Sequence, residues 1–133
     1  MKNITIVLLV LISFTAKSQP FVGMALNTNS AEMHAGYAFN QIELTATYKV
    51  PFSGLGFINI ASLNISKAYH FSDSLYYVRA GVGIANYNRY NISVIAPNYR
   101  SEIGRRYQQG TLFLLIDYCK NIFIMAGLKI YIK

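Results

Sequence analysis

Alternation between apolar and polar residues, repeated along most of the chain, constrains the fold more than any other feature of the sequence. The clearest example is IELTATYKV, residues 42–50, in which every second residue is apolar and the others are Glu, Thr or Lys. A period of two places alternate side chains on opposite faces of an extended strand, whereas an amphipathic helix needs a period near 3.6. Because no segment after residue 18 combines helical period with helical length, the sequence predicts an all-β domain.

Seven segments carry this pattern between turn-forming residues. The predicted strands are 20–28, 31–39, 42–51, 56–71, 75–90, 109–119 and 122–132. In the fourth of them the apolar residues change face between Ile60 and Leu63, which predicts a bulge or kink between these positions. The segment 86–109 contains Asn, Pro, Gly and several basic residues, so it is interpreted as a long polar loop, or as a loop around one short strand.

The first residues have the composition of an export signal. Lys2 is followed by an apolar run from Ile4 to Phe14 and then by Ala16-Lys17-Ser18, a small-x-small pattern. These are the n-region, h-region and cleavage site of a secretory signal peptide. The apolar run is too short for a membrane-spanning helix, which needs about 20 residues. The sequence therefore predicts a signal peptide over residues 1–18 and a mature domain over residues 19–133.

Charged residues are scarce in this chain. They make up 13% of it, against about 25% in a typical soluble domain. Residues 19–133 contain ten basic and five acidic side chains, a formal net charge of about +5. The single cysteine, Cys119, excludes a disulfide framework and a zinc site built from several cysteines, so stability must come from another source.

The alternation is compatible with two environments for the apolar face. In a soluble barrel or sandwich that face forms the core, while in a membrane barrel it contacts lipid and the polar face lines a narrow lumen. The polar face here consists largely of Gly, Ala, Thr, Ser and Asn, which suits a crowded lumen better than a solvated surface. Aromatic residues also gather near predicted strand ends, where a girdle would meet the bilayer interfaces. These pairs are Tyr37/Phe39, Tyr48/Phe52, Tyr69/Phe71, Tyr76/Tyr77 and Tyr87/Tyr90.

Charges of both signs occur on the polar face. A closed interior requires them to be paired, because an unpaired ion in a low dielectric costs several kcal/mol. We therefore predict a charge network in the lumen. Its members are Glu32, Glu43, Lys49, Arg79, Asp117 and Lys129.

The signal peptide, the alternating strands with short turns and the terminal AGLKIYIK together resemble one family. The chain is similar to the small outer-membrane β-barrels of Gram-negative bacteria, the eight-stranded OmpA/OmpX-like class. The terminal segment resembles the assembly signal of such barrels, although Lys133 stands where the family usually places Phe or Trp. The resemblance implies a closed antiparallel up-and-down transmembrane barrel in the outer membrane, monomeric and without cofactors, that is delivered by the barrel assembly machinery. Because such barrels have an even number of strands, the eighth must come from 91–107, with NISVIAP as the best candidate.

The segment 86–109 carries four of the ten basic residues of the mature domain. They are Arg89, Arg100, Arg105 and Arg106. In an exported protein, anionic lipopolysaccharide is a better counterpart for such a basic loop than nucleic acid, and an ordinary solvated loop needs no counterpart. We expect this loop to be the part of the protein that contacts other molecules.

Candidate catalytic and metal sites are few. His34 and His70 are far apart in the sequence and neither has a second ligand type at metal-binding spacing, so we expect no metal site. His70 and Ser72 resemble the His-x-Ser pair of outer-membrane lipid A deacylases, but that family places an Asn after the Ser, where this chain has Asp73. The glycines of AGVGIAN, residues 80–86, alternate within a strand, whereas a dinucleotide-binding loop needs them between a strand and a helix.

These observations favour a non-enzymatic outer-membrane barrel with a structural, adhesive or surface-interaction role. We expect no open pore, since eight strands leave an interior that side chains can fill. Its partners would be outer-membrane lipids, including lipopolysaccharide, and not nucleic acid. Two alternatives stay open: a soluble periplasmic barrel that binds a small apolar ligand, and an outer-membrane enzyme that modifies lipid.

Overall fold

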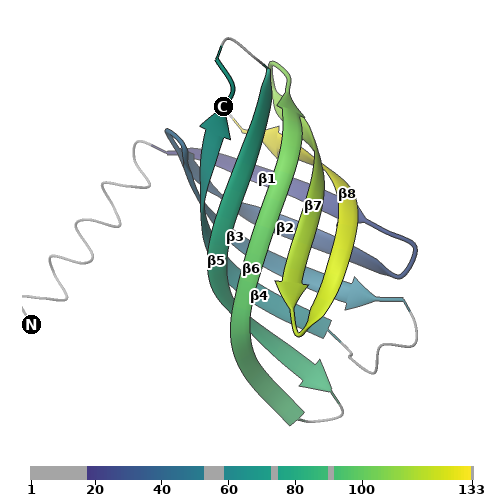
Figure 1. Cartoon of the computed structure of the whole chain (residues 1–133). Coiled ribbons are helices and arrows are strands. Elements are labelled where there is room, and N and C mark those ends of the chain that lie inside the picture. The colour runs from purple at the N-terminus through teal and green to yellow at the C-terminus, as the bar shows by residue number, and fades with distance from the viewer. Residues whose placement is uncertain (1–17, 53–58, 73–74, 90–91, 133) are drawn as a thin grey trace, which may run out of the picture.

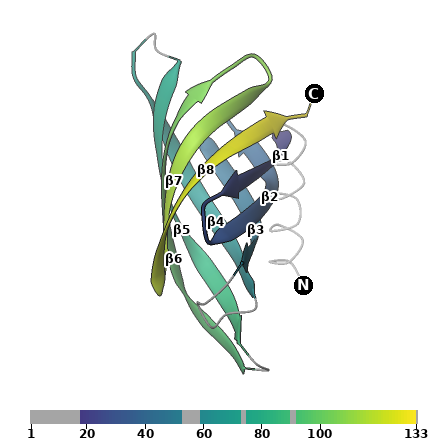
Figure 2. The same cartoon turned by 90° about the vertical axis from the view of Figure 1, so that its right-hand side faces the viewer.

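The computed structural model describes residues 18–52, 59–72, 75–89 and 92–132, so residues 1–17 of the predicted signal peptide lie outside it. Each strand pairs antiparallel with the next and β8 pairs with β1, which closes the sheet into an up-and-down barrel (Figures 1 and 2). The predicted fold class and the number of eight strands are confirmed. The strands are β1 (Gln19–Leu26), β2 (Ser30–Phe39), β3 (Ile42–Pro51), β4 (Asn59–His70), β5 (Tyr76–Arg89), β6 (Ile92–Arg106), β7 (Gly110–Cys119) and β8 (Asn121–Tyr131). The described residues include no helix long and apolar enough to cross a membrane.

The eighth strand lies where the sequence indicated a loop. β6 spans 15 residues and pairs with β5 from Tyr76↔Arg105 to Arg89↔Ile92. β6 lies within the range 91–107 predicted for the eighth strand, with residues 92–97 of the candidate segment at its beginning. The interpretation of 86–109 as a long loop is wrong. Pro97 is tolerated because this part of β6 pairs with β5 alone, and β7 joins only from Tyr99 onward.

β4 is also more regular than the sequence suggested. Its register with β3 is continuous from Lys49↔Ile60 to Ile42↔Lys67, so the expected bulge is absent from this pairing. Ile60 points into the barrel and is 2% exposed, while Leu63 points outward. The apolar residues change face because part of the lumen is itself apolar.

Tight turns join described strands at both ends of the barrel. We call the end at which β1 begins and β8 ends the terminal end, and the opposite one the distal end; the terminal end is uppermost in Figure 1. At the terminal end a tight turn joins β2 to β3, with Asn40 at a φ of 53°. At the distal end, Asn27 Oδ1 accepts hydrogen bonds from the backbone N–H groups of Asn29 and Ser30, at 2.8 and 2.7 Å. This Asx-type turn fixes the register of the first hairpin.

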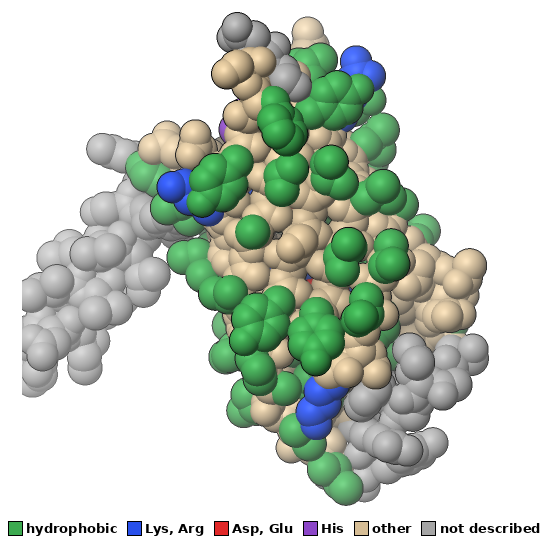
Figure 3. Space-filling view, in the orientation of Figure 1, with side chains coloured by type: hydrophobic (Ala, Val, Ile, Leu, Met, Phe, Trp, Pro, Cys, Tyr) green, Lys and Arg blue, Asp and Glu red, His purple; other side chains and the backbone are tan. Residues whose placement is uncertain are grey.

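Polar side chains face the lumen and apolar ones face outward. Along β3, buried and exposed residues alternate strictly. The buried ones are Glu43, Thr45, Thr47 and Lys49. Hydrophobic side chains spread over the outer wall instead (Figure 3), and Leu114 and Ile130 are 56% and 48% exposed. This is the reverse of the soluble barrel alternative, whose apolar side chains would point inward around a ligand.

Candidate functional site

The lumen of the barrel holds two groups of buried charged side chains, each with two acids and two bases. The terminal cluster consists of Glu43, Arg79, Glu102 and Lys129. The distal cluster consists of Glu32, Lys49, Arg100 and Asp117. Each cluster has equal numbers of positive and negative side chains, so neither has a net charge. Charged side chains can be tolerated in a medium of low dielectric constant when they are paired in this way.

The terminal cluster is a ring in which each cation bridges both carboxylates. Arg79 Nη2 lies 2.9 Å from Glu43 Oε2, and Arg79 Nη1 lies 2.6 Å from Glu102 Oε1. On the opposite side, Lys129 Nζ lies 2.7 Å from Glu43 Oε1 and 3.1 Å from Glu102 Oε2. Tyr77 adds a hydrogen bond from its hydroxyl to Glu102. The ring joins β3, β5, β6 and β8, most of which are not neighbours in the sheet.

The distal cluster crosses the barrel in the same way. Arg100 Nη2 on β6 lies 2.7 Å from Glu32 Oε1 on β2. Lys49 Nζ pairs with Asp117 and lies 3.5 Å from Glu32 Oε2, which connects β3 to β7 and β2. His34 Nδ1 lies 3.4 Å from Glu32 Oε1. Pairs between opposite strands resist flattening of the barrel, which hydrogen bonds between adjacent strands cannot do.

The structure places every residue of the predicted lumen network inside the barrel and distributes them over these two clusters. Two further members, Arg100 and Glu102, lie on β6 within the segment interpreted as a loop. The sequence pattern that could have identified them is the alternation around them. Tyr99, Ser101 and Ile103 are exposed, and the residues between them are buried. Charge counting could not reveal them, because they add one charge of each sign.

An apolar group packs around the distal cluster and extends toward the terminal cluster. Its members are Ala25, Ile60, Ala85, Tyr87, Phe113, Leu115, Phe123 and Met125. Lys49 Nζ lies 4.0 Å from the centroid of the Phe123 ring, so the distal cluster and the apolar group are in direct contact. Lumen glycines make room for the larger rings: a Cβ at Gly127 would collide with the Phe113 ring, and one at Gly104 would lie 2.5 Å from the Tyr77 hydroxyl. The lumen is therefore packed with side chains from the apolar group to the terminal cluster.

At the terminal end the lumen opens into a polar cavity of about 320 Å³. Arg79, at its floor, belongs to the terminal cluster, and Arg106 and Tyr131 lie at its wall. His70 is also in the wall, with its ring centroid 5.9 Å from that of Tyr77. Ser72, the other half of the His-x-Ser pair, lies exposed beyond the end of β4. In the described part of the chain, His, Cys, Asp and Glu side chains do not group in a way that could hold a metal ion.

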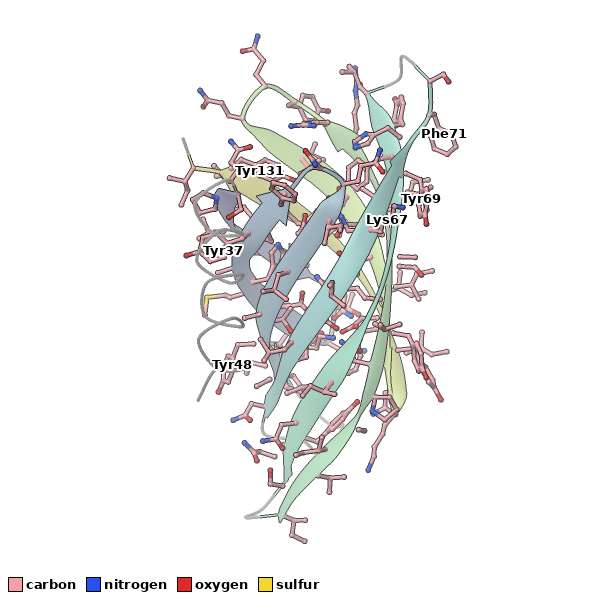
Figure 4. The ribbon with its side chains drawn as sticks, turned by 90° about the vertical axis from the view of Figure 1, so that its left-hand side faces the viewer. Tyr37, Tyr48, Lys67, Tyr69, Phe71 and Tyr131 are labelled. Carbon is pink, nitrogen blue, oxygen red and sulfur yellow. The ribbon has the colours of Figure 1, made fainter. Side chains whose placement is uncertain are left out.

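The outer wall has aromatic side chains near both ends. Tyr37, Tyr69, Phe71, Tyr76 and Tyr107 are exposed toward the terminal end, and Figure 4 shows Tyr69 and Phe71 following one another outside β4. Tyr48, Phe52, Tyr99 and Tyr118 are exposed toward the distal end. Between them the exposed residues are mainly Ile, Leu, Val and Met. At ten residues and a tilt near 40°, β7 spans roughly 25 Å, the height of the apolar band of a membrane barrel.

Three pairs of the predicted girdle need correction. Tyr77 and Tyr87 are each 1% exposed and point into the lumen, because both occupy the inward-facing positions of the alternation along β5. Phe39 is partly buried at the end of β2. Tyr90 lies outside the described residues.

The predicted basic loop is not formed. Arg100 is buried in the distal cluster, while Arg105 and Arg106 are exposed at the terminal end of β6. Arg89 ends β5 at the distal end, so it is separated from Arg105 and Arg106 by the length of the barrel. The four arginines therefore do not form one surface, because the segment that carries them is a strand.

The comparisons with known proteins rest on structure. No family model matches the sequence, and no curated protein matches it. Among solved structures, a barrel described as "De novo design of transmembrane beta-barrels" superposes with a TM-score of 0.63 at 16% identity, over 87% of this chain and 96% of the designed one. The N-terminal β-barrel domain of Pseudomonas aeruginosa OprF superposes with a TM-score of 0.60 at 16% identity, over 86% of this chain and 94% of the OprF chain. The chain therefore has the fold of the small eight-stranded transmembrane β-barrels, the OmpA/OmpX-like class that its sequence resembles.

Proposed function

We propose that this chain is a non-enzymatic outer-membrane protein with a structural role, a sealed barrel that spans the membrane as a monomer with its terminal end in the periplasm. The observation that carries the proposal is the lumen, where two charge-balanced clusters and an apolar group fill the space between opposite strands. Export by a cleaved signal peptide and delivery by the barrel assembly machinery belong to the same proposal. The outward apolar wall supports the membrane location, because an exposed apolar surface of this extent has no place in a soluble monomer.

The same side chains support the proposal that the barrel has no open pore. A permeating ion would have to separate Lys49 from Asp117 and Arg100 from Glu32, and then cross the apolar group around Phe123 and Leu115. Each of these contacts joins strands on opposite sides of an eight-stranded barrel, whose interior is only wide enough for side chains. The charged side chains therefore stabilise the wall and do not line a conduction path.

A surface-interaction role is the second candidate, and the β5–β6 hairpin supports it. At the distal end, β6 pairs with β5 from Ile92 onward but with β7 only from Tyr99, so the hairpin projects beyond β7 (Figure 2). Ile92 and Ile95 are 65% and 72% exposed on this projection. Lipopolysaccharide is the partner we propose for these exposed apolar side chains of the hairpin.

The proposal is tested with the purified mature protein, residues 19–133, refolded into lipid vesicles. We expect the protein to sediment with the vesicles, to resist extraction by carbonate, and to migrate differently on a gel before and after boiling. In planar bilayers we expect no stepwise conductance under conditions in which a 16-stranded porin conducts. Recovery in the aqueous phase without detergent would refute the membrane location, and stable conductance steps would refute the sealed lumen.

A further inference from the structure

Shallow apolar grooves run over the outer wall between rows of large side chains. Two of them end, toward the terminal end, at a basic side chain. The Lys67 groove, of about 530 Å³, is lined by Ile65, Lys67, Ala80, Val82, Tyr99 and Ser101. The Arg105 groove, of about 640 Å³, is lined by Met24, Tyr76, Ile103, Arg105, Leu112 and Ala126, among others.

The Lys67 groove exists because small side chains occupy its floor. Lys67 on β4 pairs with Ala80 on β5, and Ala80 pairs with Ser101 on β6, so two small outward residues follow one another across the sheet. Lys67 Nζ lies 5.4 Å from the centroid of the Tyr69 ring, the next outward residue toward the terminal end. Figure 4 shows Lys67 beside Tyr69 on the outer side of the barrel. The groove thus has an apolar body and a cationic end at the level of the aromatic side chains.

The Arg105 groove repeats this arrangement on another part of the wall. Ala126 on β8 pairs with Leu114 on β7 and leaves a depression beside it. The Arg105 guanidinium lies 5.6 and 5.4 Å from the ring centroids of Tyr76 and Tyr107, which hold it near the terminal end of the groove. The two grooves therefore share one design: apolar walls, a small residue on the floor, and a cation flanked by tyrosine.

The exposed charged side chains of the described residues are all positive. The four acidic residues in the described part of the chain are all buried in the two lumen clusters. The exposed charged side chains there are Lys67, Arg105, Arg106 and Lys120, all basic. No acidic side chain of the described outer wall therefore neutralises the cations at the groove ends. A molecule that neutralises them must itself be negatively charged.

We propose that each of these grooves binds one anionic glycerophospholipid, with an acyl chain in the apolar groove and the headgroup phosphate on Lys67 or Arg105. This inference rests on the proposed membrane location and adds a ligand class and two sites to it. Because both cations lie at the terminal end, the lipids belong to the leaflet at that end, which is the periplasmic one in the proposed orientation. The ammonium or guanidinium pairs with the phosphate, and the tyrosine hydroxyls lie at the headgroup level, where such rings are favoured.

Other grooves on the same wall provide internal controls. One is lined by Val22, Met24, Met33, Ala35, Ala46 and Tyr48, and another by Ala46, Ala61, Leu63, Ile84 and Ile95. Neither has a Lys or Arg residue in its lining. Ala46 lines both, so filling that position tests whether an apolar depression is sufficient for lipid retention.

The experiment is native mass spectrometry of the folded barrel in detergent, titrated with phosphatidylglycerol or with phosphatidylcholine of the same acyl chains. We expect about two phosphatidylglycerol molecules to be retained, and Lys67→Gln or Arg105→Gln each to weaken one of them about fivefold, the loss that corresponds to one basic residue at a membrane surface. Ala80→Leu should displace the lipid of the Lys67 groove by filling its floor. Lys120→Gln and Ala46→Leu should leave retention unchanged.

Several outcomes would overturn the inference. Equal retention of phosphatidylcholine, equal weakening by Lys120→Gln, or unchanged retention in Ala80→Leu would each show that the grooves do not select an anionic lipid. A second protein chain in the same spectra, lost in Ala80→Leu, would show that the groove is a dimer contact. A boiling-dependent gel shift confirms that each variant is folded, and failure of the wild-type protein to insert into vesicles would refute the proposed function separately.

Discussion

Lys129 Nζ lies 2.7 Å from Glu43 Oε1 inside the barrel, and this ion pair connects the last strand to the third. Both side chains are almost fully buried, with 1% and 2% of their surface exposed. Water therefore does not screen the pair, and each ion depends on its partners in the ring. The consequence is an asymmetry that mutation can measure: losing one member is costly, whereas losing a matched pair is not.

Lys129→Met should destabilise the barrel by about 3–5 kcal/mol, because Glu43 and Glu102 would then share Arg79 alone. The double variant Lys129→Met/Glu43→Gln restores neutrality and should regain more than half of that loss. The measurement is urea-induced unfolding in lipid vesicles followed by circular dichroism. Lys120→Met is the matched control, since Lys120 is exposed, and it should change stability by no more than about 0.5 kcal/mol. Equal losses in the single and double variants would contradict the ring.

Arginines of β6 should separate into two classes. Arg100→Gln removes a buried partner of Glu32 and should cost about 3–5 kcal/mol of unfolding free energy. Arg105→Gln removes an exposed guanidinium and should cost less than about 1 kcal/mol. The same unfolding assay checks both variants. Similar small effects would support the solvated loop that the sequence suggested and would contradict the strand.

These arginines also show why the sequence predicts the wall better than the site. The period-two pattern places the side chains of β2, β3, β7 and β8 correctly, because one face of each strand is consistently apolar. In β6 the pattern is hidden, since Pro97 and Asn98 resemble loop residues and the distal part of the strand pairs on one side only. Alternation gives the face of a side chain and not its height, so it cannot tell which opposite strand a charge will meet.

Tyr77 and Tyr87 illustrate the same limit for aromatic residues. Their positions near strand ends are typical of a girdle, yet their parity places them in the lumen, where both are buried. Ile60, Phe113 and Phe123 are likewise apolar residues on a polar face. Packing explains all five, because a narrow lumen needs large side chains to fill it wherever charges are not paired.

Gly127→Val should destabilise the barrel by about 1–3 kcal/mol, the usual range for overpacking. Its Cβ would collide with the Phe113 ring and would lie 2.5 Å from the backbone oxygen of Met24, so neither a rotamer change nor a small shift removes the clash. Ala126→Val, one residue earlier on the outward face, is the control and should be nearly neutral. Unfolding midpoints in urea provide the comparison. A Gly127→Val variant as stable as the control would show that the lumen is loosely packed at this point.

A positive charge on the wall should be costly in proportion to its depth in the bilayer. Leu114 lies midway along β7 and points outward, so Leu114→Arg should lose about 2–4 kcal/mol of stability, the value for the centre of a membrane. Tyr118→Arg, also outward but near the distal end of the same strand, should lose about 0–1 kcal/mol, because arginine can reach the interface there. The unfolding free energy of both variants is measured with urea in vesicles and again in micelles of a detergent with a shorter alkyl chain. The difference between the two variants should be smaller in the micelles. If Leu114→Arg proved as stable as the wild type in vesicles, the outer face of β7 would have to contact water, and the membrane orientation of the whole wall would be wrong.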